Sequence, residues 1–206
     1  MEAAKTTVFL DTMFRVNVSV NVDRIGLISY ELRLCYSNRL LKGVNVELPE
    51  GHFLTPEDPG NIFVAALGVN QTGGYAYAAV TLTAWSSTRD VEKGKVGNGT
   101  LITVTFRAEE IGSSNLTVRD YIFLREMDLP GDLGSTVLGG LVEVVLPDFN
   151  NDGKVDISDL AIISMAFGST PGHGRWNPAW DVNKDSKINI LDMVITAKYF
   201  GMTVAK

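Results

Sequence analysis

Apolar and polar residues alternate along the first two thirds of the chain. Every second residue is apolar from position 14 to 22, and the same alternation runs from 28 to 36, with Cys35 on the polar side. A period of two predicts strands with one buried face. Further strand-like runs occupy 44–48, 62–69, 75–84, 101–108, 115–121 and 138–146.

Clusters of Gly, Pro and Asn at 56–60, 94–99 and 130–134 separate these runs, and no strong helical period interrupts them. Eight or nine strands divided by turns are typical of an antiparallel β-sandwich or jelly roll. We therefore predict a β-sandwich domain over residues 1–146, a length that can bury a real core.

Residues 147–206 have a different pattern, with seven Asp, no Glu and apolar residues at helical spacing. These apolar residues predict two short helices, one through Leu160, Ile163, Met165 and Phe167 and one through Met193, Val194, Ala197 and Phe200. A helix of about ten residues is unstable alone in water, so another interaction must hold this second domain together.

The second domain repeats itself. Residues 148–168 align with residues 181–201 at an offset of 33, with nine identities in 21 positions. The first twelve residues of each copy fit the calcium-loop pattern D-x-[DN]-x-[DN]-G, in which closely spaced carboxylates and carbonyls supply the six to eight oxygens that calcium prefers. Two Asp-rich turns that bind nothing would be the alternative, but two copies in register favour calcium.

Each loop has six candidate ligands, at loop positions one, three, five, seven, nine and twelve, where position seven offers its backbone carbonyl. In the first loop they are Asp148, Asn150, Asp152, Lys154, Asp156 and Asp159, and in the second Asp181, Asn183, Asp185, Lys187, Asn189 and Asp192.

The loops depart from the EF-hand pattern in two respects. Position twelve is Asp instead of Glu, and no helix enters either loop, because VEVVLP precedes the first and the proline-containing PGHGRWNPAW precedes the second. The second loop also has Ser186 where the first has Gly153, and Asn189 where the first has Asp156. We expect the second site to bind calcium more weakly.

This pair of loop–helix units resembles a type I dockerin, a calcium-dependent module that docks onto a cohesin domain. The resemblance implies two calcium ions and a contact surface at loop positions ten and eleven and one to two turns along each helix. The implied contact residues are Ile157, Ser158, Ser164 and Met165 in the first repeat and Ile190, Leu191, Ala197 and Lys198 in the second.

The second contact set is the more apolar, so we expect it to bind better. Packing of Ile157, Ile190 and Leu191 inside the module is an equally weighted alternative.

The first domain resembles a cohesin. The resemblance rests on its opening strands, FRVNVSVNVDRIGLISYELRLCYSNRLLKGVNV, and on GNGTLITVTFRAEEIGSSNLTV at 97–118, although Ser37-Asn38 replaces the Asp expected after the tyrosine. The segment FGSTPGHGRWNPAWD is similar to dockerins of archaeal surface and secreted proteins.

Both resemblances imply a non-catalytic assembly or scaffold protein. Its partner would be a cohesin or dockerin of another protein or of another copy of itself, and the short link at Leu146-Pro147 disfavours docking back onto the same chain. No paired-carboxylate motif, nucleophile motif or Gly-rich phosphate loop suggests an enzyme.

A carbohydrate-binding or cell-surface adhesion module is the second interpretation. Tyr75, Tyr77 and Trp85 share the parity of one strand, and Trp176 and Trp180 flank the second loop. Aromatic residues on one strand face are more often core, and we expect core packing for the first three.

Charge and composition exclude further classes of protein and bear on its location. A net charge of −6 gives no basic footprint for nucleic acid, and no apolar run approaches the ~20 residues that span a membrane. The N-terminus has no signal-peptide pattern. Four N-x-[ST] sequons favour an extracellular or cell-surface location and glycosylation, at Asn17, Asn70, Asn98 and Asn115.

Overall fold

The computed structural model describes residues 4–54, 62–83, 94–125 and 139–203. The chain forms two compact units, Met1–Glu143 and Val144–Lys206, which we call the β-unit and the repeat unit. None of the helices in the described ranges is long and apolar enough to cross a membrane.

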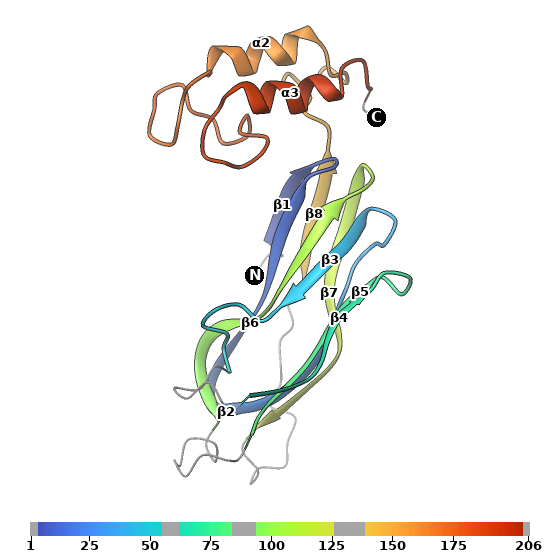
Figure 1. Ribbon diagram of the computed structural model, residues 1–206, viewed down its shortest axis with the longest axis vertical. Coiled ribbons are helices and arrows are strands. Elements are labelled where there is room, and N and C mark those ends of the chain that lie inside the picture. The colour runs from blue at the N-terminus through green and yellow to red at the C-terminus, as the bar shows by residue number, and fades with distance from the viewer. Residues whose placement is uncertain (1–3, 55–61, 84–93, 126–138, 204–206) are drawn as a thin grey trace. The chain divides into compact units, whose positions relative to one another are not determined.

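The β-unit is built from strands (Figure 1), and the Gly- and Asn-containing segment 94–99, predicted to separate two strands, lies largely within β6. Their bounds are β1 Ala4–Phe9, β2 Met13–Cys35, β3 Leu41–Glu47, β4 Ile62–Asn70, β5 Tyr75–Leu82, β6 Lys95–Ala108, β7 Gly112–Arg125 and β8 Gly140–Val145.

Strand β2 belongs to both layers of the β-unit. Its first half pairs antiparallel with β6, and its second half pairs antiparallel with β5 and β7. The rings of Phe14 and Tyr36, near opposite ends of β2, both contact Phe106, with centroids 5.7 and 4.8 Å away. The strand therefore turns back on itself. Two strands predicted from the sequence are one bent strand, and the fold is the expected sandwich.

The remaining strands extend these layers. The sheet order is β1-β8-β7-β2-β5-β4, while β6 bridges β2 and β3. Strand β1 was not among the predicted runs. Its Val8 and Phe9 are both buried although they are adjacent, so this strand does not show the period-two pattern.

The alternation places the core as expected along β2, where Tyr30, Leu32 and Leu34 are buried. On β5, however, the buried positions are Ala76, Ala78 and Val80, and the tyrosines point the other way. The expectation of core packing was therefore wrong for Tyr75 and Tyr77, which are half-buried on the outer side. Trp85 lies outside the described residues.

The repeat unit contains the two predicted helices, α2 (Ile157–Met165) and α3 (Ile190–Lys198), but each ends two residues before the last apolar residue predicted for it, Phe167 or Phe200. Each helix begins with a reciprocal capping box, in which Asp156 pairs with Asp159 and Asn189 with Asp192. The capping residues are therefore the candidate ligands at positions nine and twelve, so each loop and its helix share a boundary. Within the described segment 139–203, no helix enters either loop, as expected.

Candidate functional site

The first loop folds around its own side-chain oxygens. The carboxylate of Asp148 accepts the N–H of Asp152 at 3.2 Å and of Gly153 at 2.9 Å. Asn150 Oδ1 accepts the N–H of Asp152 at 3.0 Å, and Asp152 Oδ1 accepts the N–H of Lys154 at 2.9 Å. These bonds tie the side chains at positions one, three and five to the backbone of positions five to seven.

The second loop reproduces this network. Asp181 accepts the N–H of Asp185 at 3.1 Å and of Ser186 at 2.9 Å. Asn183 accepts the N–H of Asp185 at 3.0 Å, and Asp185 accepts the N–H of Lys187 at 2.9 Å. Equivalent bonds in the two loops differ by no more than 0.1 Å, so the sequence repeat is also a geometric repeat.

Both loops use left-handed backbone at positions four and six. The φ angles are 58° at Asn151 and 93° at Gly153 in the first loop, and 60° at Lys184 and 67° at Ser186 in the second. A non-glycine residue in this conformation costs about 1–2 kcal/mol. The second loop therefore has this strain at position six, where the first loop has glycine.

The carboxylates at position twelve are buried. Asp159 and Asp192 are both 0% exposed. Asp159 accepts the N–H groups of Phe149 at 2.7 Å and Asp156 at 2.8 Å. Asp192 accepts the N–H groups of Val182 and Asn189, each at 2.8 Å. No ion pair to either carboxylate exists among the described residues. A buried charge that lacks a counter-charge is costly, and a bound cation would supply one.

The donor chemistry fits a hard cation. An ionised carboxylate has about four lone-pair sites, so accepting backbone N–H groups still leaves sites for a metal. Within the described ranges no three His, Cys, Asp or Glu side chains cluster closely enough to hold a metal ion by themselves. Each loop therefore needs Asn side chains and a backbone carbonyl, that of Lys154 or Lys187, to complete its set of calcium ligands.

Hydrogen bonds lower the pKa of one candidate ligand. The pKa of the Asp156 carboxyl lies below its usual range, chiefly because the carboxylate accepts the N–H of Ser158, at 2.7 Å. Asn189 accepts the N–H of Leu191 at the same distance. The first loop consequently keeps an additional negative charge at position nine that the second loop lacks.

All eight contact residues implied by the resemblance are exposed. Ile157 is 68% exposed, Ile190 57% and Leu191 53%, so the alternative that they pack inside the module was wrong. Val194 is 59% exposed and lies one helical turn after Ile190. The sequence pattern predicted Val194 only as part of the helical period, although its spacing of four residues from Ile190 could have identified it as part of the exposed stripe.

Each helix thus presents an exposed stripe. The α2 stripe consists of Ile157, Ser158, Ala161, Ser164 and Met165, and the α3 stripe of Ile190, Leu191, Val194, Ala197 and Lys198. The α3 stripe is the more apolar at its start, and it ends in a cation where the α2 stripe ends in Met165.

The β-unit has a second exposed surface, the outer sheet face, formed by the outward residues of β7, β2, β5 and β4. Cross-strand register groups these residues into rows. From the apolar end the rows are Leu124, Ser29, Thr81 and Phe63; then Ile122, Glu31, Ala79 and Ala66; then Arg119, Arg33, Tyr77 and Gly68.

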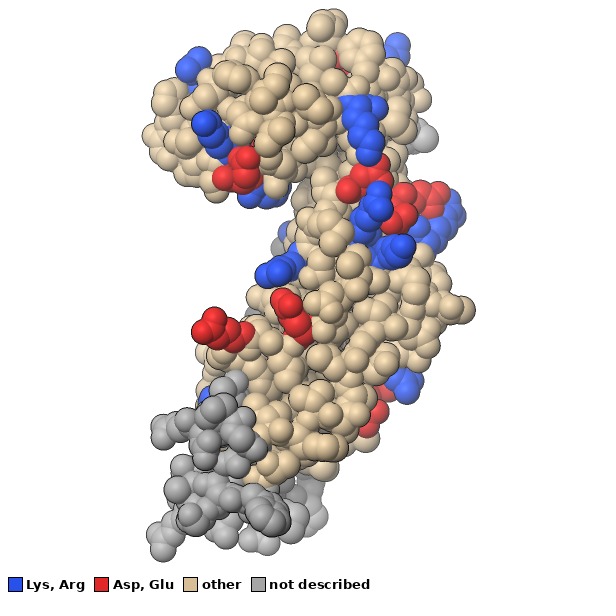
Figure 2. Space-filling view, in the orientation of Figure 1, with Lys and Arg blue, Asp and Glu red and all other residues tan. Residues whose placement is uncertain are grey.

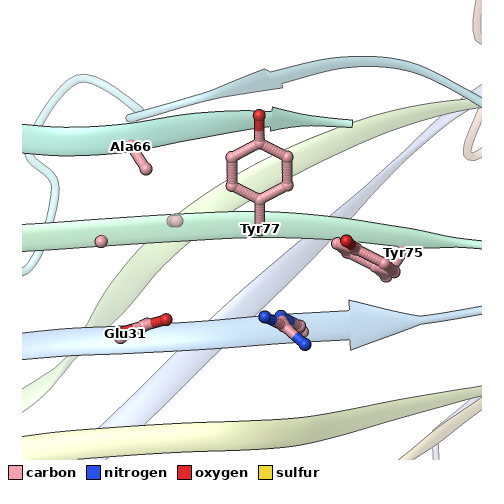
Figure 3. A pocket seen from close by; sticks show the side chains of 7 residues that line it. Glu31, Ala66, Tyr75 and Tyr77 are labelled. Carbon is pink, nitrogen blue, oxygen red and sulfur yellow. The ribbon is translucent and has the colours of Figure 1, made fainter. Parts of the chain in front are cut away.

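A shallow depression of about 200 Å³ lies on the outer sheet face. Figure 3 shows Glu31 on β2, Ala66 on β4, and Tyr75 and Tyr77 on β5 around it. Arg33 lies 5.1 Å from the centroid of the Tyr75 ring and bonds Asp120 at 3.1 Å. Glu31 has no ion pair among the described residues, so it is available to a partner's cation.

The four sequons differ in accessibility. Asn17, Asn98 and Asn115 are exposed. Asn70 is half-buried, and its amide donates to Tyr75 Oη at 2.9 Å while its oxygen accepts the N–H of Gly73 at 2.8 Å. The Asn17 side chain is also engaged, because its Oδ1 accepts the hydroxyl of Thr103 at 2.9 Å, but Asn17 is exposed whereas Asn70 is half-buried.

Comparison with known proteins matches both units. Residues 146–201 match the family model described as the Dockerin type I domain. A type I cohesin–dockerin complex from Clostridium thermocellum has a chain with 17% identity and a TM-score of 0.52, covering 70% of this chain and 96% of that one. Searched against curated proteins, the chain has no match.

Two further solved structures are similar. A cohesin–dockerin complex from Acetivibrio cellulolyticus has a chain with 14% identity and a TM-score of 0.51, covering 70% of this chain and 96% of that one. A cohesin from Clostridium acetobutylicum has 17% identity and a TM-score of 0.50, covering 70% and 88%.

The fold and the site define a two-unit chain, in which a mostly β unit precedes a pair of loop–helix repeats. The modules are a β-unit with the cohesin fold and a dockerin type I segment at 146–201. In the two complexes named above, a cohesin is bound to a dockerin.

Proposed function

We propose that this protein is a non-catalytic assembly component, with a cohesin-like module at 1–146 and a calcium-binding dockerin module at 147–206. The observation that carries this proposal is the pair of exposed stripes on helices that each begin at an Asp-rich loop. Cohesin and dockerin families are interaction modules without catalysis, which supports assembly over chemistry.

Two calcium ions would be held by the six oxygen donors of each loop, from Asp148 to Asp159 and from Asp181 to Asp192. The buried carboxylates at Asp159 and Asp192 support this proposal, because each lacks a counter-charge among the described residues. The ion supplies positive charge and fixes the loop from which each helix starts.

The α3 stripe is the better candidate for docking. It begins with three adjacent apolar side chains, Ile190, Leu191 and Val194, and apolar clusters at an interface centre contribute most of the binding energy. It also ends in Lys198, whereas the outer sheet face has Glu31 beside Ile122 and Ala79. The opposite charges of Lys198 and Glu31 favour one orientation of docking.

This complementarity makes a second copy of the chain a suitable partner. Head-to-tail docking of the α3 stripe of one copy onto the outer sheet face of the next would give a ring or an open chain. Light scattering at millimolar calcium and after chelation tests this. We expect a mass above the monomer that falls to the monomer on chelation, and a monomer in both conditions would reject self-association.

Charge-swap variants make the test specific. Glu31→Lys places two cations in apposition, and Lys198→Glu places two anions, so we expect each variant alone to be monomeric. A mixture of the two should associate again, because the lysine face of the first matches the glutamate stripe of the second. A mixture that stays monomeric would reject docking between copies and leave calcium-dependent docking to another protein as the proposal.

The module types and the sequons support an extracellular or cell-surface location, with Asn17, Asn98 and Asn115 as the accessible glycan acceptors. Mass spectrometry of protein from its own host would test this. Unmodified asparagine at all three positions would reject glycosylation.

Carbohydrate binding is a second candidate function, favoured by the outward Tyr75 and Tyr77 beside the depression. Their rings are tilted by 59°, with centroids 6.2 Å apart, so they do not form one flat platform for a sugar chain. Pull-down with cellulose or chitin tests the idea. Retention that is lost in Tyr77→Ala would support it.

A further inference from the structure

Each loop in the repeat unit is held by the end of the other repeat. Val155, at position eight of the first loop, donates its N–H to Met202 O at 2.9 Å and accepts the N–H of Gly201 at 2.8 Å. Both partners follow helix α3, which belongs to the second repeat. A bridge between Lys154 and Thr203 extends the pairing.

The second loop is held in the reciprocal way. Ile188, at its position eight, donates its N–H to Ser169 O at 3.0 Å and accepts the N–H of Gly168 at 2.8 Å. These partners follow helix α2, which belongs to the first repeat. Val155 and Ile188 are both fully buried, so these backbone bonds are shielded from water.

The contacts form a closed circuit. The first loop caps α2, the end of α2 holds the second loop, the second loop caps α3, and the end of α3 holds the first loop. Position eight lies between the ligand carbonyl at position seven and the capping ligand at position nine. Pairing at position eight therefore restrains the backbone on which both neighbouring ligands are placed.

From this circuit we infer that the two calcium loops form one positively cooperative unit, in which loading one loop raises the calcium affinity of the other. The inference rests on the proposed calcium function. Ordering the first loop orders α2 and its end, which removes part of the entropy that the second loop would otherwise lose on binding. Coupling between two sites is commonly 5- to 150-fold in affinity and is reciprocal.

Matched glycine variants test the circuit without altering a ligand. Gly168 has φ 81° and Gly201 has φ 84°, and a Cβ built on either meets no atom within 4 Å. Alanine there introduces backbone strain alone. In the full chain we expect Gly201→Ala to weaken calcium binding at the first loop and Gly168→Ala at the second, each by about 5-fold or more.

Calorimetric titration with calcium and hydrogen exchange at the amides of Val155 and Ile188 provide the readouts. Asp181→Ala, which removes a ligand of the second loop only, should lower the calcium affinity of the first loop by at least about 5-fold and speed exchange at Val155. Asp148→Ala should lower the calcium affinity of the second loop by a similar factor and speed exchange at Ile188. Deletion of residues 204–206 is the control that leaves the paired segment in place.

The outcomes separate this inference from the proposed function. Two ions that bind with affinities insensitive to the other loop's mutation would overturn the coupling and leave calcium binding intact. Failure of the unmodified chain to bind calcium would overturn both. Circular dichroism of each variant at saturating calcium shows whether the helices still form, and a weakened but folded variant supports the circuit.

Discussion

Tyr30 Oη lies 3.0 Å from Nε2 of His52 inside the β-unit, and the same hydroxyl donates to the carbonyl of Leu101 at 2.8 Å. The proton between the two side chains must therefore come from His52 Nε2. His52 is only 2% exposed, and its Nδ1 has no partner among the described residues. A second proton on this ring would be buried without an acceptor.

This arrangement predicts an acid-sensitive β-unit. Burial, and secondarily the charge of Lys95, lower the pKa of His52 from 6.5 to about 4. A lowered pKa means that the unfolded state binds more protons, so the contribution to stability is complete above pH 6.5 and is lost as pH falls towards 4. We expect the free energy of unfolding to fall by up to about 3 kcal/mol over this range.

Urea unfolding of the full chain at saturating calcium, compared with His52→Gln, measures this contribution. The glutamine keeps a donor towards Tyr30 but does not titrate. The pH slope between 4 and 6.5 should be smaller in the variant, and equal slopes would show that His52 is not responsible.

Calcium removal should unfold the repeat unit selectively. Helices α2 and α3 have nine residues each, shorter than the ~12–15 residues at which an isolated helix is marginal in water. We expect a chelator to abolish most of the helical circular dichroism while the sheet signal persists. The double variant Asp148→Ala/Asp181→Ala should resemble the chelated protein even in calcium. A helical signal that survives in both would contradict the prediction.

The two loops should differ in calcium affinity because of position six. Ser186 has a left-handed backbone that costs about 1–2 kcal/mol, and Ser186→Gly relieves it. We expect this substitution to tighten calcium binding at the second loop by about 5- to 30-fold, measured by calorimetry. Gly153→Ser is the matched change and should weaken the first loop. An unchanged affinity in Ser186→Gly would show that the strain is relieved in some other way.

Binding by the stripes should depend on α3 more than on α2. Leu191 and Ser158 occupy equivalent positions in the two repeats, and both are exposed. Loss of a central apolar anchor costs about 2 kcal/mol, so we expect Leu191→Ala to weaken association of copies about 30-fold in sedimentation experiments. Ser158→Ala should leave it within about twofold. Equal effects of the two substitutions would argue that α2 and α3 dock equally well.

Local chemistry explains why the sequence predicted some features well. The calcium-loop positions depend on short spacing, so the turns at Gly153 and Ser186 and the helix starts at Asp156 and Asn189 could be placed before any tertiary contact was known. The period of two likewise placed Leu32 and Leu34 inside.

Long-range pairing explains what the sequence did not predict. The β5 tyrosines have the parity of a buried row, but small residues, Ala76 and Ala78, fill the core side of that strand. The pairing of Val155 with Met202 joins the two ends of the repeat unit and has no sequence pattern. Nor does periodicity show that 14–22 and 28–36 are halves of one bent strand.

The outer sheet face carries two neighbouring cations, Arg33 and Arg119, beside its apolar rows. Lys and Arg side chains are interspersed with Asp and Glu on the face of the molecule in Figure 2. Among the described residues of the β-unit, salt bridges such as Arg39–Glu110 and Arg107–Asp11 join exposed or half-buried side chains. Salt bridges between exposed side chains of this kind contribute little to stability.

Cys35 is the chain's single cysteine, and its half-buried thiol lies on the outward side of β2, opposite Tyr75 and Thr117 in the register. The molecule thus contains a built-in chemical reporter on the same face as the tyrosine depression. A thiol-reactive dye attached there would need no engineered residue, and its alkylation rate would slow whenever another polypeptide covered that face.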